Sequence, residues 1–539
     1  MNKKNIIIFL VLYVFGLFFL KDVNANFDEN LEQTILKRNI IEYSELLRVD
    51  RVTNRLKKEG IVPISLDSEK DHGIAAYYTF TPLFLLRRVS PHALSIAWHV
   101  YTFTIFFIGT IFLFLLIKYL SHSEKIAYLT SLLYFISPRI LIDSFNNNKD
   151  IVFMSLLIIM IYFACKFIDK KKFKDGLLFG LFAAFVCNIK ILGIFFFGIF
   201  GLSYIFYLLY KKEINKRNFL LGLFVAVFGL ALYVILTPAM WGSGIHIIDF
   251  YKYCLSNATN FRGQISVLFE GTYYGGNNNP IPWYYLPKLM VITLPLMTTI
   301  LFIFGIFYFI KDTYKVLFKK EKISLKYLII LGTIMSFLVP FMICVLKHPN
   351  VYNGWRHFYF LYGLLFIVIG YGLIYILNNN FKKVIMPLII ISLFISLFYI
   401  FKYNVRNTAY YNILVNRKNL SGYYELDYYN TTGRDSLSKF LNRKDLIYNS
   451  NNRVNIYGNG FNKYAIEMIL FNDTSFKDKI DLIYPDDLKD KILNGETVYE
   501  MSNILYSELN NYDKKKIYSY KIFKSDITRF YLIEGVKDE

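Results

Sequence analysis

The chain has 539 residues, 55% of them hydrophobic and 19% aromatic, and a mean hydropathy of +0.36, which excludes an ordinary soluble globular protein. The formal net charge of +21 would suit nucleic-acid binding, but residues 402–539 hold 21 Lys and Arg against 19 Asp and Glu, and residues 21–95 hold 11 against 11. The excess therefore lies among the apolar segments, where basic loops serve topology and contact anionic lipid, and we expect no nucleic-acid partner.

Apolar runs long enough to cross a hydrocarbon core of about 30 Å recur over the first three quarters of the sequence. They predict an all-α polytopic membrane bundle of about eleven transmembrane helices within residues 1–401. These helices are expected near residues 5–20, 96–117, 126–142, 150–168, 175–189, 191–210, 218–237, 288–310, 326–346, 357–377 and 382–401. Only a very short loop around Lys190 divides two of the runs.

Basic residues in the short loops predict the orientation of the bundle. The loops on one side hold 20 Lys and Arg, and the short loops on the other side hold five. Because cytoplasmic loops retain Lys and Arg, the N-terminus is expected in the cytoplasm, with residues 21–95, 238–287 and 402–539 outside. The first apolar run also fits a cleavable signal peptide ending near Ala25, which would leave residue 26 onward outside as well.

The first outer loop opens with Asp28 and Glu29, where the chain leaves the membrane. A carboxylate just above the bilayer can deprotonate an acceptor hydroxyl or amine, and ionisable groups at the rim of a bundle are candidates for function. An amphipathic helix predicted over residues 30–48 would hold Asp28 above the bundle. The alternative is that Asp28 merely caps this helix, but we favour catalysis by Asp28 and Glu29.

A second polar cluster lies between the third and fourth predicted spans. Arg139 and Lys149 can clamp a phosphate there, and Asn148 and Asp150 are candidates for substrate binding. An Asn-rich turn needs no ligand, but two cations and two acids in one tight loop at membrane depth exceed what a turn requires.

The outer loop 238–287 ends in Pro-Trp-Tyr-Tyr-Leu-Pro, which indicates a shaped lid or interfacial belt, with Tyr285 as a candidate substrate contact. A third cluster contains Arg356 and His357 at the start of a span, placed to bind a lipid-borne phosphate. Interfacial snorkelling is the alternative for Arg356. Neither His348 nor His357 has metal-site spacing, so we expect no metal.

Residues 402–539 predict a small outer α/β domain, with helices at 435–441 and 463–470 and alternating strand patterns at 453–457, 517–523 and 529–533. The domain has no cysteine, so it must fold on its own core. Glu425 and Asp427, just after the last span, either belong to an edge strand or cover the site as candidate substrate contacts.

The sequence contains neither a Walker A lysine loop nor a G-x-G-x-x-G motif after a strand. The large loops also face away from cytosolic nucleotide sugars. Any group transferred outside should therefore arrive activated on a lipid carrier, and we expect no other cofactor.

Together these motifs resemble the bacterial C-type (GT-C) membrane glycosyltransferases, in particular the branch of protein O-mannosyltransferases and lipid A aminoarabinose transferases. The motifs are Asp-Glu at 28–29, Ser-Pro-Arg at 137–139, Asn-x-Lys-Asp ending at 150, Pro-Trp-Tyr-Tyr-Leu-Pro at 282–287, Trp-Arg-His-Phe-Tyr-Phe at 355–360 and Glu-Leu-Asp-Tyr at 425–428. The resemblance implies inverting transfer of a sugar from a polyprenyl-phosphate donor. The acceptor would be a protein, lipid A or another glycolipid at the outer face of the bacterial cytoplasmic membrane.

The resemblance also implies roles for individual residues. Asp28 would be the general base with Glu29 beside it, and Arg139, Lys149 and Arg356, aided by His357, would neutralise the departing phosphate. Asparagine replaces the expected proline in the Asn-x-Lys-Asp turn, so a looser turn is expected there. Tyr429-Asn430 replaces an expected Trp-Gly.

Three other classes of protein fit parts of the sequence. One, a sensor or assembly protein that uses residues 402–539 as a binding module, leaves the polar clusters at the outer rim unexplained. A transporter or flippase for lipid-linked saccharides would need polar residues at mid-membrane, whereas the ionisable groups here gather at the outer rim. A polysaccharide polymerase or ligase would use the same kind of donor with another acceptor.

Overall fold

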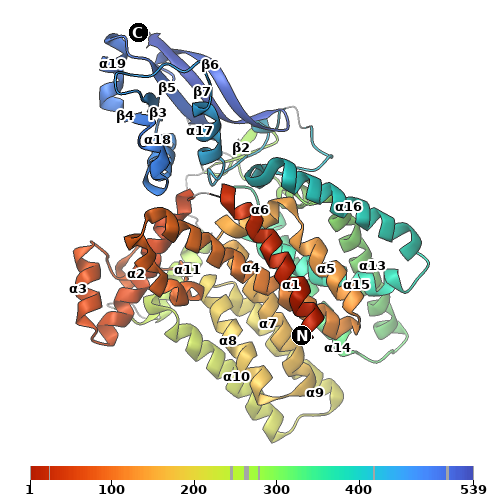
Figure 1. The fold of residues 1–539 in the computed structure, drawn as a ribbon. Helices are drawn as coiled ribbons and strands as arrows, with labels where there is room; N and C mark the ends of the chain where they lie inside the picture. Colours follow the sequence, from red (N-terminus) through yellow and green to blue (C-terminus); the bar gives the residue numbers. More distant parts are fainter. Residues whose placement is uncertain are drawn as a thin grey trace.

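The computed structural model describes residues 2–23, 25–242, 247–259, 266–276, 279–416, 419–505 and 509–537. A bundle of long helices forms most of the molecule, and a small sheet domain lies at one end of it (Figure 1). The bundle contains α1 (Lys3–Leu17), α4 (Pro91–Ser121), α5 (Glu124–Phe135), α6 (Pro138–Asn146), α7 (Asp150–Lys170), α8 (Phe173–Ile189), α9 (Gly193–Lys211), α10 (Lys216–Ile235), α12 (Tyr285–Thr293), α13 (Leu296–Phe318), α14 (Leu325–Lys347), α15 (Tyr359–Leu377) and α16 (Lys382–Tyr403).

Each of the eleven predicted apolar runs is helical, but fewer of them qualify as full spans. Among the described residues, nine helices are long and apolar enough to cross a membrane, or ten if the bent pair α5 and α6 counts as one span. The difference lies in α8, whose 17 residues are short of the roughly 20 that a crossing needs. The predicted fold class is confirmed, with nine or ten spans among the described residues in place of about eleven.

Two prolines shape the bundle near its outer end. Pro138 begins α6, which is bent by 68° from α5, because proline cannot donate a backbone hydrogen bond to the preceding turn. All nine residues of α6 are buried. Pro295 separates α12 from α13 in the same way, so the run predicted near 288–310 is broken.

The first outer loop folds into helices on the outer end of α4. They are α2 (Phe27–Leu46), α3 (Asp50–Lys58) and the 3₁₀ helices η2 (Ile64–Leu66) and η3 (Ala75–Arg88). The cap of α2 is Asn26, whose side chain accepts from the Asp28 backbone N–H at 3.0 Å. The alternative that Asp28 itself caps the helix is therefore wrong.

The predicted outer loop 238–287 lies partly outside the described residues. Its described elements are η4 (Pro238–Met240), α11 (Ile247–Thr259) and a hairpin of β1 (Val267–Phe269) and β2 (Thr272–Tyr274).

Beyond α16 lie η6 (Asn404–Ala409), η7 (Leu420–Gly422) and the α/β domain that the sequence predicts. The domain consists of α17 (Gly433–Leu441), β3 (Val454–Tyr457), α18 (Phe461–Asn472), η8 (Thr474–Phe476), β4 (Ile480–Ile483), α19 (Pro485–Leu493), β5 (Val498–Asn503), β6 (Tyr512–Ile522) and β7 (Ser525–Val536). The strand order is β4-β3-β5-β7-β6, parallel from β4 to β5 and antiparallel from β5 to β6. Apolar residues of both helices and strands, including Phe440 and Phe530, form its own core.

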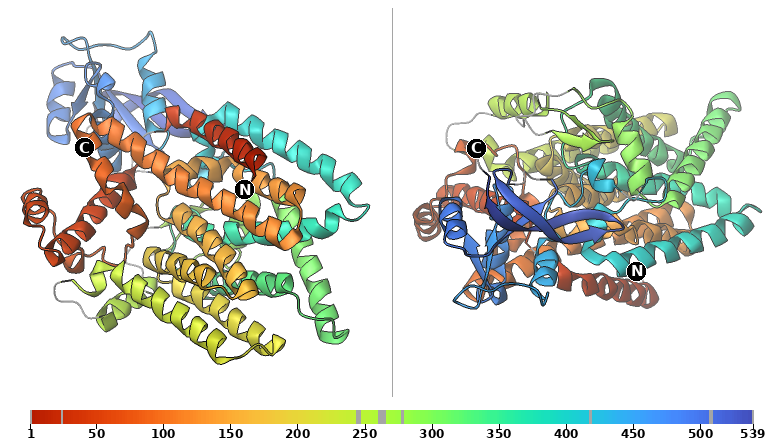
Figure 2. Two further views of the ribbon diagram at one scale, coloured as in Figure 1. Left: turned by 60° about the horizontal axis from the view of Figure 1, so that its bottom comes forward. Right: turned by 90° about the horizontal axis from the view of Figure 1, so that it is seen from above.

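The sheet domain and the outer helices meet at the start of α2. The rings of Phe27 and Tyr464 stack with centroids 5.7 Å apart, and Asn30 Nδ2 lies 2.8 Å from Met468 Sδ. In Figure 1 and in the left view of Figure 2 the turn between α9 and α10 is at the end of the bundle opposite the sheet domain. This arrangement agrees with the predicted placement of basic loops on one side and large polar segments on the other.

Candidate active site

A cavity of about 470 Å³, here named the Asp28 cavity, opens where several segments of the outer end meet. Most of its lining comes from the start of α2, the loop 68–72, the turn 147–150, residues 189–192 at the end of α8 and residues 352–357 before α15. Six of the predicted site residues line it: Asp28, Asn148, Lys149, Asp150, Arg356 and His357. These residues come from three parts of the chain, and Asp28 and Arg356 are 328 residues apart.

Asp28 and Arg356 form an ion pair in this cavity. Arg356 Nη1 donates to Asp28 Oδ2 at 2.9 Å, with the Asp28 side chain 38% exposed and that of Arg356 only 7%. The guanidinium lies over the rings of Tyr352 and Tyr429, each 4.9 Å from it. Within the described part of the chain, Arg356 Nε is buried without a hydrogen-bond partner. The arginine is therefore held in place and still has a donor to offer.

A second ion pair joins Asp150 to Lys190 on the other side of the same cavity. Lys190 Nζ also donates to the His357 carbonyl at 3.1 Å, which ties the end of α8 to the start of α15. Lys149 lines the cavity beside them, and desolvation lowers its pKa. Among the described residues, its ammonium makes no ion pair, so its charge is available to a ligand.

The turn that carries Lys149 and Asp150 is fixed by its own side chains. Asn147 Oδ1 accepts from the backbone N–H groups of Lys149 at 3.2 Å and Asp150 at 2.7 Å. Asn147 Nδ2 donates to Asp150 Oδ2 at 2.9 Å. This is the ordinary way in which asparagine fixes a turn, so the looser turn expected without proline is not observed.

Glu29 does not reach the cavity, contrary to the predicted pairing with Asp28. Its carboxylate is buried against α4, where it accepts from Ser95 Oγ at 3.1 Å and lies 3.3 Å from His99 Nε2. Gln33 Nε2 donates to it from the next turn of α2 at 3.0 Å. Consecutive residues of an α-helix point about 100° apart, so the two acids face different surroundings.

Arg139 also lies away from the cavity. Its guanidinium donates to the Tyr410 carbonyl at 2.9 and 3.3 Å and lies over the Tyr411 ring at 5.0 Å, and the residue is 1% exposed. Asp143, one turn further along α6, accepts from Tyr359 Oη at 2.5 Å. We name these five residues the Arg139 cluster. The bend before α6 turns Arg139 into the bundle and leaves only the end of the helix near the cavity.

The remaining predicted contacts lie beside the site and do not line the cavity. Glu425 Oε2 accepts from the Gly354 N–H at 2.7 Å, and Tyr285 Oη donates to the Gly354 carbonyl at 2.9 Å. Both therefore hold the turn just before Arg356. Burial raises the pKa of Glu425 to about 7. Asp427 accepts four hydrogen bonds from the backbone and hydroxyl groups of Thr431 and Thr432, and so fixes the chain before α17.

Sequence reasoning missed several residues that line the cavity. Lys190, Tyr352 and Tyr429 surround the ion pairs, and Lys190 could have been noticed as a lone cation in a very short loop between apolar runs. Three neighbouring residues whose side chains can bind a metal ion, Glu69, Asp71 and His72, also line the cavity. Their close spacing in a polar loop is the feature of the sequence that indicates such a group.

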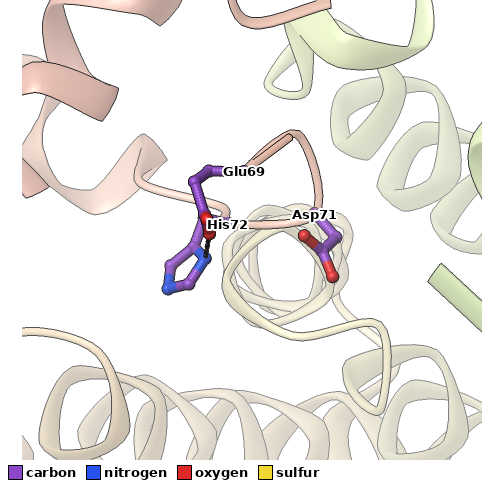
Figure 3. A group of neighbouring side chains, drawn as sticks. All are labelled: Glu69, Asp71 and His72. Atoms are coloured by element: carbon purple, nitrogen blue, oxygen red, sulfur yellow. Dashed lines mark ion pairs between the residues drawn. The ribbon is translucent and has the colours of Figure 1, made fainter. Parts of the chain in front are cut away.

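This group could hold a metal ion, because its ligand atoms lie within 4.8 Å of one another. Figure 3 shows Glu69 and His72 facing each other, with Asp71 on the same loop. His72 Nδ1 is 3.0 Å from Glu69 Oε2, and Asp71 Oδ2 accepts from Asn257 Nδ2 at 2.8 Å. The side chains thus also have partners within the protein, and independence of metal remains a prediction.

Comparisons with known proteins bear on part of the chain. The model of the dolichyl-phosphate-mannose-protein mannosyltransferase family matches residues 71–241. This match confirms the predicted resemblance over a segment that contains Lys149, Asp150 and Lys190 but neither Asp28 nor Arg356.

The chain is similar to a solved structure, ArnT from Cupriavidus metallidurans bound to undecaprenyl phosphate. The similarity covers 99% of this chain and 98% of the ArnT chain. The two are 10% identical, with a TM-score of 0.45. The comparison with curated proteins finds no match.

Proposed function

We propose that the protein is an integral-membrane glycosyltransferase that moves a sugar, with inversion, from a polyprenyl-phosphate donor to an acceptor on the extracytoplasmic face. The observation that carries this proposal is the Asp28–Arg356 ion pair in a cavity that Lys149 and Lys190 also line. A partly exposed carboxylate and three cations around one space supply the base and the positive charge that the reaction needs. The family match over residues 71–241 supports the same class of donor.

Donor binding would separate the ion pair. A donor phosphate in the cavity competes with Asp28 for Arg356, which can bind phosphate through two parallel N–H groups. Lys149 and Lys190 add further positive charge. The exchange frees the Asp28 carboxylate to act as a base when donor is present.

The chemical step is then an in-line displacement at the anomeric carbon. Asp28 takes the proton of the acceptor hydroxyl or amine as that atom forms its bond to the sugar. The bond from the anomeric carbon to the phosphate oxygen breaks, and its electron pair leaves with the polyprenyl phosphate. Arg356 and the two lysines stabilise the developing charge on that phosphate, and Asp28 later releases its proton to water.

The replacement Asp28→Asn tests this assignment. We expect sugar transfer to fall by a factor of about 10³, within the usual range for loss of a general base, with expression and membrane insertion unchanged. The products are identified first, by mass spectrometry of membrane glycolipids and glycoproteins from cells with and without the protein. The variants are then compared for that product.

Glu29→Gln is the matched control, because it makes the same chemical change one residue away on the buried side of α2. It should retain transfer within a few-fold of wild type. Retained turnover in Asp28→Asn would refute the proposed base, and equal losses in the two variants would show that α2 needs both acids for its structure.

A further inference from the structure

A second cavity lies on a different face of α2 from the Asp28 cavity. It has a volume of about 950 Å³ between α2, α3 and η3. Thr34, Lys37 and Ile40 of α2 line it, whereas Asp28, Leu31 and Glu32 line the Asp28 cavity. At 1.5 Å per residue, Lys37 lies about 14 Å from Asp28 along the helix axis.

The lining of this second cavity is strongly basic. Five cations, Lys37, Arg51, Arg55, Arg87 and Arg88, face one carboxylate, that of Glu59. The whole loop 21–95 contains equal numbers of basic and acidic residues. The excess of cations in this cavity therefore results from the way the loop folds. Glu59 pairs with Lys37 at 2.8 Å and Arg55 at 3.3 Å. Among the described residues, no carboxylate pairs with Arg51, Arg87 or Arg88.

Apolar side chains form the rest of the lining. They are Ile40, Val52, Leu56, Ile61, Pro82, Phe84 and Leu85. A smaller cavity of about 380 Å³ shares Thr34, Lys37 and Arg87 and reaches Phe471 of α18. The two cavities adjoin at these three shared residues and are together named the α2–α3 groove.

Exposed apolar side chains also lie elsewhere on the outer helices. Leu46 and Leu47 at the end of α2 are 64% and 69% exposed, and Val89 after η3 is 77% exposed. In a protein whose bundle spans the membrane, such residues on an outer loop fit the bilayer interface. Cations above apolar surface at that depth match a lipid that carries a phosphate headgroup and acyl chains.

We propose that the α2–α3 groove binds an anionic, phosphate-bearing membrane lipid. Arg51, Arg87 and Arg88 hold the headgroup, since arginine can bind phosphate through two N–H groups at once. Phe84 and Leu85 contact the acyl chains. The site is separate from the Asp28 cavity, and bound lipid fixes α2 and α3 against the membrane surface.

The test is lipid binding by the purified full-length protein in detergent, measured by titration with fluorescent phosphatidylglycerol and, for comparison, phosphatidylcholine. We expect tighter binding of phosphatidylglycerol. The double replacement Arg51→Gln and Arg88→Gln should weaken it about 30-fold, since each cation near an anionic lipid surface is worth a factor of about five. Leu85→Ser should weaken long-chain more than short-chain phosphatidylglycerol.

Two controls give the result its meaning. Lys57→Gln with Lys58→Gln removes the same charge from α3 outside the groove and should change binding less than three-fold. Arg356→Gln, in the other cavity, should leave this binding unchanged. Equal losses in the two double variants, a loss only in Arg356→Gln, or displacement by inorganic phosphate at the lipid's own concentration would each overturn the proposal. None of these outcomes depends on sugar transfer, so a failure of the proposed enzyme activity is recognised separately.

Discussion

The Asp28 cavity and the Arg139 cluster contain the same kinds of side chains, but only the first has room for a ligand. In the Arg139 cluster, Arg139 is 1% exposed and its guanidinium is hydrogen-bonded to the Tyr410 carbonyl. In the Asp28 cavity, Arg356 faces about 470 Å³ of space and retains a buried N–H without a partner in the described chain. A charge near the outer end of a bundle therefore indicates a binding site only where space and unused hydrogen-bonding capacity accompany it.

The largest expected difference between the Arg139 cluster and the Asp28 cavity is in the stability of the folded protein. Arg139→Gln should lower the free energy of unfolding by about 3 kcal/mol, because it removes buried hydrogen bonds and leaves Asp143 with less positive charge nearby. Thermal unfolding of the purified protein measures it. The fraction of this variant that remains folded should show an unchanged KM for the donor. A raised KM would instead support the prediction that Arg139 binds the donor phosphate.

Arg356→Ala should act on the donor. We expect a rise of about 30-fold in the donor KM, equivalent to about 2 kcal/mol of lost charge-assisted binding. Steady-state transfer at varied donor concentration measures this rise. Unchanged donor dependence would favour the reading in which Arg356 only anchors its span at the interface.

A smaller effect concerns Glu425, which holds the turn just before Arg356. Burial raises the pKa of Glu425 to about 7, so between its usual value near 4.5 and pH 7 the folded protein holds a proton that the unfolded chain has lost. Stability should therefore fall as pH rises through this window. In Glu425→Gln the fall should be smaller, by about 1–2 kcal/mol. Unfolding temperatures at pH 5 and pH 7 measure the difference, and equal slopes in both proteins would contradict it.

Removal of divalent metal should have the smallest effect. We expect less than a two-fold change in transfer after treatment with EDTA, because Arg356, Lys149 and Lys190 already supply positive charge to the cavity. Transfer by the dialysed protein, with and without added Mn²⁺ or Zn²⁺, is the measurement. A loss that the ion restores, and that His72→Gln reproduces, would place a metal at Glu69, Asp71 and His72.

The helical pattern of the chain could be predicted because it depends on local sequence. All eleven apolar runs are helical, and the α/β domain lies where alternating polar and apolar residues begin. The prediction that Asp28, Lys149 and Arg356 face one space also agrees with the structure, because each follows or precedes a span at the same end of the bundle. The predictions for Glu29 and Arg139 were less successful, since both depend on which way a side chain points.

The sequence by itself determined a membrane bundle with an outer α/β domain and placed its polar clusters at one end, since hydropathy and basic loops act over single segments. Only the tertiary structure decided which charges share a cavity. A turn of 100° per residue separates Asp28 from Glu29, and a bend of 68° buries Arg139. The hydrogen bond from Lys190 to the His357 carbonyl links the end of α8 to the residues before α15. Such contacts join residues far apart along the chain, and no local pattern encodes them.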